Sequence, residues 1–173
     1  RYQYDTGGFL TKIIDRNGDV TRQWNDKRGN VLSYETCRTT VTCGVQHFTY
    51  HVTPKNEFDP RNDRMIAFRD ERSSSETDDR YATKWELNEF GEVIKETTPA
   101  TPDFPQGRST VYTYTDGSEP AVGGGVTPAG LLKSEKDPKG NETTYKYTAS
   151  GDVAKVTEPS GLVIEYTYDA LGR

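Results

Sequence analysis

The sequence lacks the features that mark several large classes of protein. No cluster of Lys or Arg occurs among its 22 basic residues, and the formal net charge is −5. A surface for nucleic acid is therefore not expected. No apolar run approaches the roughly 18 residues of a transmembrane helix, and no signal peptide is visible. We therefore expect that the chain neither binds nucleic acid nor spans a membrane.

Groups that carry catalysis are also scarce. The only two histidines, His47 and His51, lie close together, and no Gly-x-Ser-x-Gly nucleophile elbow occurs. The Gly123–Gly125 run is not followed by the Lys-Ser/Thr pair of a phosphate-binding loop. Adjacent acids such as Asp78 and Asp79 lie in a Ser-rich segment, where solvated charge is the expected role. We therefore expect no enzyme activity, no metal and no cofactor.

What the sequence does contain favours β-structure. Only 31% of the residues are hydrophobic, yet 11 are Tyr and 6 are Phe, while Ala and Leu are scarce for a helical protein. Tyr, Thr and Val favour strands. Low hydrophobicity with 28% charged residues is also typical of disorder. The aromatic residues recur at regular spacing, however, and this indicates a folded, all-β chain.

Glycines recur with a period of 21 residues. Gly151 lies 21 residues before Gly172, and a second glycine falls 10 residues into the interval, at Gly161. A fixed period of this size marks a repeat architecture. The glycines that we assign to repeat positions are Gly8, Gly18, Gly29, Gly91, Gly130, Gly140, Gly151, Gly161 and Gly172.

Each repeat is interpreted as two strands and two turns. In the last copy, strands are expected at Val153–Glu158 and Leu162–Tyr168, with Tyr166 and Tyr168 on one face of the sheet. Equivalent strands are expected at Asn141–Tyr147 and Val20–Trp24. A chain that turns about every ten residues between alternating strands is an antiparallel strip of β-hairpins.

The whole chain, residues 1–173, is interpreted as one repeat region and as a section of a longer protein. Regular repeats cover 4–30 and 127–173, and the repeats in 31–126 are irregular, which gives about six units. Asp63 takes the place of a repeat glycine, and its partner strand is expected at Tyr81–Leu87. Exposed insertion loops are expected at Glu71–Asp79, Thr98–Pro105 and around the Gly123–Gly125 run.

Cys37 and Cys43 flank a short expected turn, and we predict a disulfide between them, with two free thiols as the alternative. Adding His47 and His51 gives a pattern that could be read as a zinc site. On a strand, however, residues four apart lie roughly 13 Å from each other, so zinc is not favoured. Asp15–Asp19 vaguely resembles a calcium loop but lacks its downstream Glu, so a turn is predicted.

The repeat resembles the Rhs, or YD-repeat, family. The segment from Tyr166 to Arg173 is similar to the family's Tyr-x-Tyr-Asp-x-x-Gly-Arg ending, with Tyr166, Tyr168, Asp169 and Gly172 in place. The N-terminal copy carries the same pattern at Gly8, Leu10, Asp15, Gly18, Trp24, Asp26 and Gly29.

The resemblance implies a long strip of β-hairpins that spirals into a hollow shell around a C-terminal polypeptide, often a toxin. Bacterial Rhs toxins, the C components of insecticidal toxin complexes and teneurins share it. Residues 1–173 contain neither the self-cleaving segment of many such shells nor a toxin domain. The expected partners are further YD repeats and an enclosed effector, and the expected location is outside the cell or on its surface.

The functional hypothesis is therefore a structural wall segment with no catalytic residue. The turn glycines would carry this role together with stacked aromatic residues: Trp24, Trp85, Tyr114, Tyr147, Tyr166 and Tyr168. The alternative is a recognition module that binds glycans or proteins through its insertion loops. Unpaired strand edges would also favour self-association.

Overall fold

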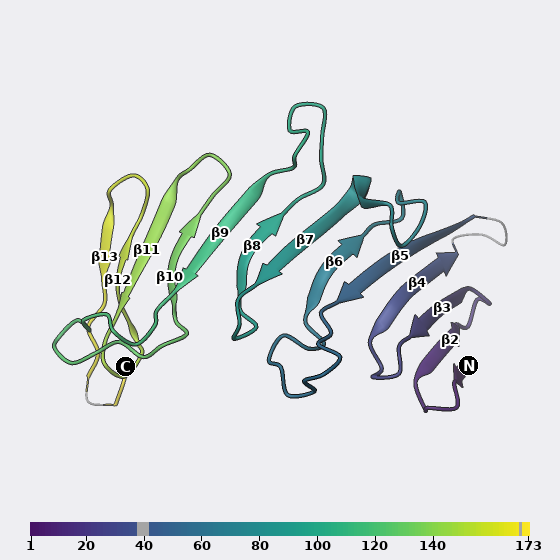
Figure 1. Cartoon of the computed structure of the whole chain (residues 1–173), viewed down its shortest axis with the longest axis horizontal. Coiled ribbons are helices and arrows are strands. Elements are labelled where there is room, and N and C mark those ends of the chain that lie inside the picture. Colours follow the sequence, from purple (N-terminus) through teal and green to yellow (C-terminus); the bar gives the residue numbers. More distant parts are fainter. Residues whose placement is uncertain (38–41, 170) are drawn as a thin grey trace. The chain divides into compact units, whose positions relative to one another are not determined.

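The computed structural model describes residues 1–37, 42–169 and 171–173. It confirms the all-β prediction: thirteen strands follow one another in the sheet in the order of the chain, and the registered neighbours run antiparallel (Figure 1). The chain divides into two compact units, one of residues 1–91 and 97–108 and one of residues 92–96 and 109–173. The described residues contain no helix with the length and apolar character needed to span a bilayer.

The first unit contains seven strands and one short 3₁₀ helix, η1. Each strand forms a hairpin with the next, as in the pair β3–β4, where Gln23 lies opposite Tyr34. The elements are β1 (Tyr2–Tyr4), β2 (Leu10–Ile14), β3 (Val20–Asn25), β4 (Val31–Cys37), β5 (Cys43–Tyr50), β6 (Met65–Arg69), η1 (Asp79–Tyr81) and β7 (Ala82–Leu87).

The second unit repeats this hairpin arrangement. Its register shifts by one residue at two β-bulges, between Leu132 and Ser134 and between Lys146 and Tyr147. The strands are β8 (Val93–Thr97), β9 (Ser109–Tyr114), β10 (Leu132–Lys136), β11 (Glu142–Tyr147), β12 (Val153–Thr157) and β13 (Val163–Glu165).

The alternation of the sequence is visible in the burial of β11. Thr143 and Tyr145 are half-buried and Tyr147 is buried, whereas Thr144 and Lys146 between them are exposed. Because side chains alternate between the two faces of a strand, the face that bears the tyrosines is the less accessible one. The strand predicted at Asn141–Tyr147 is thus confirmed, and Thr143, Tyr145 and Tyr147 share one face of it.

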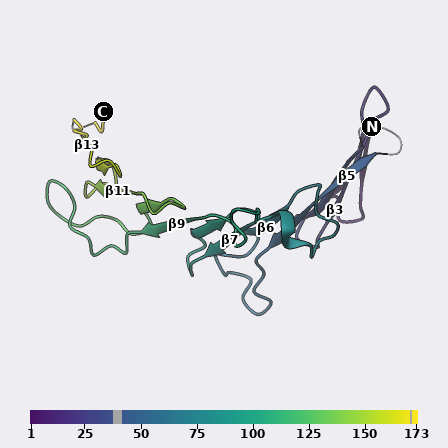
Figure 2. The same cartoon turned by 90° about the horizontal axis from the view of Figure 1, so that it is seen from above.

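The core of each unit is thin. Among the described residues, the buried hydrophobic side chains are four alanines and one tyrosine, and no large side chain is less than 2% exposed. Figure 2 shows why: within each unit the described strands form one layer, and no second layer from the described part of the chain packs on it. Apolar burial comes mainly from side chains that cover their neighbours on the same sheet.

The last strand is shorter than the sequence predicts. We expected Leu162–Tyr168, but β13 ends at Glu165. The backbone N–H of Tyr166 still donates to the carbonyl of Ala154 at 3.0 Å. Its partner strand β12 begins at Val153, directly before this point, so no further pairs can form. Tyr166 and Tyr168 therefore follow the strand instead of lying within it.

The repeat glycines all adopt a left-handed backbone conformation, with φ between 74° and 93°. Gly151 is the clearest case, with φ 93°. A Cβ atom built there meets nothing closer than 3.7 Å, at Leu131 and Pro128. Space is therefore available, and only the backbone conformation requires glycine at this position.

We predict that Gly151→Val destabilises the second unit by at least about 1–2 kcal/mol, the cost of a left-handed conformation for an ordinary residue. Gly151→Asn is the matched control, because Asn tolerates that conformation, and it should lose much less. Thermal and urea unfolding of both variants measure the difference. Equal stability of the Val and Asn variants would contradict this account.

Candidate functional site

The basic element of the candidate site is a five-residue turn whose first residue is acidic and whose fourth residue is glycine. At Asp137, one carboxylate oxygen accepts the backbone N–H groups of Lys139 and Asn141 at 2.8 and 2.9 Å. The N–H of Gly140 donates to the carbonyl of Asp137, and the N–H of Asp137 to the carbonyl of Asn141, both at 2.9 Å. One side chain therefore satisfies two donors that the turn would otherwise leave exposed.

The same four hydrogen bonds recur along the chain. They are found in the turns that begin at Asp5, Asp15, Asp26, Asp137 and Asp169. At Thr148 a hydroxyl replaces the carboxylate and accepts from the N–H of Asp152 at 3.1 Å. The turn predicted at Asp15–Asp19 in place of a calcium loop is thus confirmed. We call this arrangement the repeat turn.

Hydrogen bonding to the carboxylate changes its acidity. The pKa of Asp137 lies below its ordinary value, chiefly because the side chain of Asn141 donates to it, with the backbone of Asn141 and Lys139 adding to the effect. The pKa of Asp169 is lowered by the backbone N–H groups of Arg173 and Leu171. These acids accept hydrogen bonds as stable anions and are poorly suited to hand a proton to a substrate.

The insertion around the Gly123–Gly125 run lies inside a repeat turn. Thr115 donates its N–H to Leu131, and Gly130 donates to Thr115, both at 2.8 Å, while Leu131 donates to the Thr115 hydroxyl at 3.0 Å. These are the closing bonds of a repeat turn, yet residues 116–129 stand where other turns have two residues. The strands on either side therefore keep the pairing of a short turn.

The predicted substitution of a repeat glycine by Asp63 follows the same rule. Asp63 is the one non-glycine among the described residues with positive φ, 62°. Its N–H donates to His51 at 3.1 Å, and the N–H of His51 donates to Arg64 at 2.9 Å. The Asp63 carboxylate also accepts from Arg28 and Asn30 of the neighbouring turn. Residues 52–62 thus form a further insertion inside a turn.

Three tyrosines tie neighbouring strands together through their hydroxyl groups. Tyr147 donates to the carbonyl of Leu132 at 2.6 Å, and Tyr168 donates to that of Val153 at 2.8 Å. Tyr114 makes the equivalent bond to Val93 at 2.9 Å. Each tyrosine directly precedes the first residue of a repeat turn. The sequence singled out these tyrosines for stacking and gave no sign of their carbonyl partners.

Two other predicted aromatic residues are exposed at about half of their surface. Trp24 and Tyr166 are 48% and 46% exposed, so each presents a large part of its ring to solvent. The ring pair found in the described residues joins Phe48 of β5 to Phe68 of β6, with centroids 5.5 Å apart. Neither phenylalanine was predicted as a repeat position.

The cysteines and histidines occupy the β4–β5 hairpin and its surroundings. Cys37 and Cys43 lie opposite each other and are joined by a disulfide, while the expected turn between them at residues 38–41 lies outside the described residues. His47 contacts the Ser33 hydroxyl at 3.1 Å, and His51 contacts that of Thr53 at 3.0 Å. The four side chains are thus engaged with different partners.

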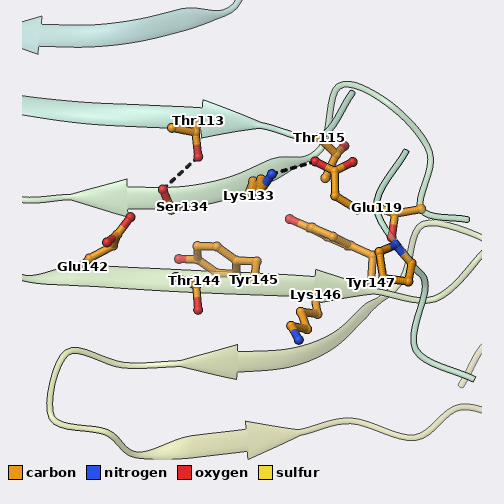
Figure 3. Close-up of a pocket in the computed structure, with 12 residues that line it drawn as sticks. Thr113, Thr115, Glu119, Lys133, Ser134, Glu142, Thr144, Tyr145, Lys146 and Tyr147 are labelled. Atoms are coloured by element: carbon orange, nitrogen blue, oxygen red, sulfur yellow. Dashed lines mark hydrogen bonds and ion pairs between the residues drawn. The ribbon is translucent and has the colours of Figure 1, made fainter. Parts of the chain in front are cut away.

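A concave surface lies in the second unit. It is a groove of about 480 Å³ between strands β9–β11 and the loop of residues 116–129 (Figure 3). Hydroxyl groups dominate its polar lining, and Thr113 contacts Ser134 at 2.8 Å. Lys133 donates to Glu119 at 2.9 Å, which raises the pKa of Lys133 and lowers that of Glu119.

Comparison with known proteins agrees with the repeat geometry. Residues 127–161 and 147–173 each match the family model described as RHS Repeat. No curated protein matches the chain significantly. The crystal structure of TcdB2-TccC3 matches 99% of this chain at 13% identity with a TM-score of 0.54, and that of TcdB2-TccC3-TEV matches 100% at 14% identity with a TM-score of 0.33.

Residues 127–173 thus carry Rhs, or YD, repeats. The first of these structures shows that the fold is shared. The chain spans only about a tenth of the structures it matches, 10% and 11% of their lengths. In these Rhs repeats the Tyr-Asp pair divides two tasks, because Tyr168 ties one strand to another and Asp169 closes the turn that follows.

We predict that Tyr147→Phe lowers the free energy of unfolding by about 1 kcal/mol, the usual value of one hydrogen bond, because it removes only the bond to Leu132. Tyr145→Phe is the matched control on the same strand. Its hydroxyl makes no hydrogen bond within the described residues, so stability should change little. Urea unfolding of both variants tests this, and equal losses would refute the role of the Tyr147 hydroxyl.

We predict that Asp137→Asn reduces the acid sensitivity of folding. Because the folded-state pKa of Asp137 is lowered, its carboxylate adds stability above the ordinary pKa, and this is lost as pH falls through the folded-state value. The free energy of unfolding should therefore fall less steeply below about pH 5 in the variant than in the parent protein. Urea unfolding from neutral to acidic pH measures both slopes, and the hypothesis fails if they coincide.

Proposed function

We propose that this chain is a wall segment of an Rhs-type β-shell that encloses and helps deliver a C-terminal polypeptide effector. The thin core is the observation that carries this proposal. A domain that works alone usually packs at least two layers around one hydrophobic core. Here the buried hydrophobic residues of the described chain are Ala67, Ala82, Ala121, Tyr147 and Ala154. A single layer of this kind is suited to separate two spaces.

The end strands support a continuation of the strip. β1 and β13 each have one neighbour in the sheet, so each presents an unpaired edge. On β1, Tyr2 and Tyr4 are 66% and 62% exposed. Further YD repeats of the parent chain would cover such edges, and an isolated section would self-associate through them.

The recurring groups favour a structural role over an enzymatic one. Carboxylates of the repeat turns are occupied by backbone donors, as at Asp26, where burial raises the pKa but hydrogen bonds from Asn30 and Arg28 outweigh it and lower it. The regular spacing of these acids therefore reflects turn closure and not a reaction centre. The Cys37–Cys43 disulfide suits an extracellular or cell-surface location, since disulfides persist in oxidising compartments.

Limited proteolysis of the full-length parent protein, followed by mass spectrometry, tests the proposal. If the repeats enclose a downstream segment, that segment should resist cleavage in buffer and become sensitive in mild denaturant that opens the strip. The same segment expressed alone is the control and should be cut rapidly in both conditions.

The opposite result would remove the shell from consideration. A downstream segment that is cut equally fast with and without the repeats is not enclosed by them. Recognition of a ligand at the surface would then become the leading function of the strip.

A further inference from the structure

The loop of residues 116–129 is not needed to join its two strands. The closing bonds between Thr115, Gly130 and Leu131 match those of the short turn at Thr148, where Gly151 donates to Thr148 at 3.1 Å. A two-residue link therefore suffices for this geometry. The extra residues add a feature that the repeat itself does not use.

The loop is held firmly against the sheet. The N–H of Val122 donates to the carbonyl of Tyr147 at 2.8 Å, and the Thr115 hydroxyl donates to that of Pro128 at 2.6 Å. Thr127 and Thr115 are only 3% and 6% exposed. The groove between the loop and the sheet is therefore preformed, and its 480 Å³ falls in the range of about 300–1,000 Å³ typical of small-molecule sites.

A row of hydroxyl groups crosses the sheet beside this loop. Thr113, Ser134 and Thr144 lie opposite one another on β9, β10 and β11. Ser134 is buried, whereas Thr113 and Thr144 are exposed. The hydroxyls of Thr113 and Ser134 contact each other at 2.8 Å, and Thr144 lies on the next strand, at a strand spacing of about 4.8 Å. Each hydroxyl can both donate and accept a hydrogen bond, so the row offers both kinds of group to a ligand.

The charges of the groove cancel. Lys133 is paired with Glu119, and β11 contributes one further charge of each sign, from Glu142 and Lys146. A phosphate-rich or strongly basic ligand would find no excess of opposite charge here. Pro120 and Tyr145 also line the groove and supply apolar surface, and Figure 3 shows the Tyr145 ring next to Thr144 along β11.

We propose that this groove binds an uncharged, polyhydroxylated ligand, namely a short neutral oligosaccharide. Such a ligand combines many hydroxyl groups with apolar C–H faces and carries no net charge, which matches the hydroxyl row, the apolar lining and the balanced charges. The site is independent of encapsulation, since it lies entirely on one unit and needs no enclosed polypeptide.

A glycan array followed by calorimetric titration of the neutral oligosaccharides that bind tests this proposal. Thr144→Val removes an exposed hydroxyl of the row and should weaken binding about tenfold, the effect of roughly one lost hydrogen bond. Thr143→Val is the matched control. It is the preceding residue of the same strand, does not line the groove, and should bind as the parent protein does.

A second variant replaces residues 116–129 with the dipeptide Ala-Ser and keeps Thr115 and Gly130. It should retain the circular dichroism of the sheet and lose binding altogether. The proposal is overturned if no neutral oligosaccharide binds the parent protein, or if Thr144→Val and Thr143→Val bind equally well. Binding confined to acidic glycans or to extended peptides would also overturn it. None of these results changes the outcome of the proteolysis test.

Discussion

The closing bonds of the repeat turn are the constraint on which the rest of this molecule depends. An antiparallel strip needs a reversal about every ten residues, and each reversal leaves backbone donors without strand partners. A single Asp or Thr side chain satisfies them, as Asp137 does for Lys139 and Asn141. The glycine that follows supplies the left-handed conformation. With the turns fixed in this way, strand register follows.

Register in turn determines what the tyrosines can do. The bulge between Lys146 and Tyr147 places Tyr147 opposite Val153, while its hydroxyl reaches back to Leu132 on the other side. β11 is therefore linked to β10 by a side chain as well as by its backbone. In a single layer with a thin core, such bonds take over part of the role that interior packing has in a globular domain.

Much of this fold could be predicted from the sequence because its signals are local. The glycine period depends on a backbone conformation that few other residues adopt, and alternation within Asn141–Tyr147 reports directly on the two faces of a strand. Even Asp63 could be recognised as a glycine substitute from its position. The extent of β13 could not, because it depends on where the partner strand β12 begins.

The groove could not be predicted from the sequence either, and here the physical reason is different. It exists because the N–H of Val122, in the loop between β9 and β10, donates to the carbonyl of Tyr147 on β11, and because hydroxyl residues from three strands align. Neither relation produces a periodic pattern in the sequence. The sequence indicated an insertion at the Gly123–Gly125 run, but turn chemistry alone gives no direction in which a loop folds.

Turn closure and loop content are thus separate properties of this chain. Thr115 and Gly130 are joined across residues 116–129 by the same bond that joins Thr148 and Gly151 across two residues. The pairing of the flanking strands therefore does not depend on which residues are inserted. The content of the loop can therefore change while the closing bonds of the turn stay the same. For the same reason, a foreign peptide inserted between the first residue and the glycine of such a turn would be displayed on a sheet whose strand pairing does not depend on it.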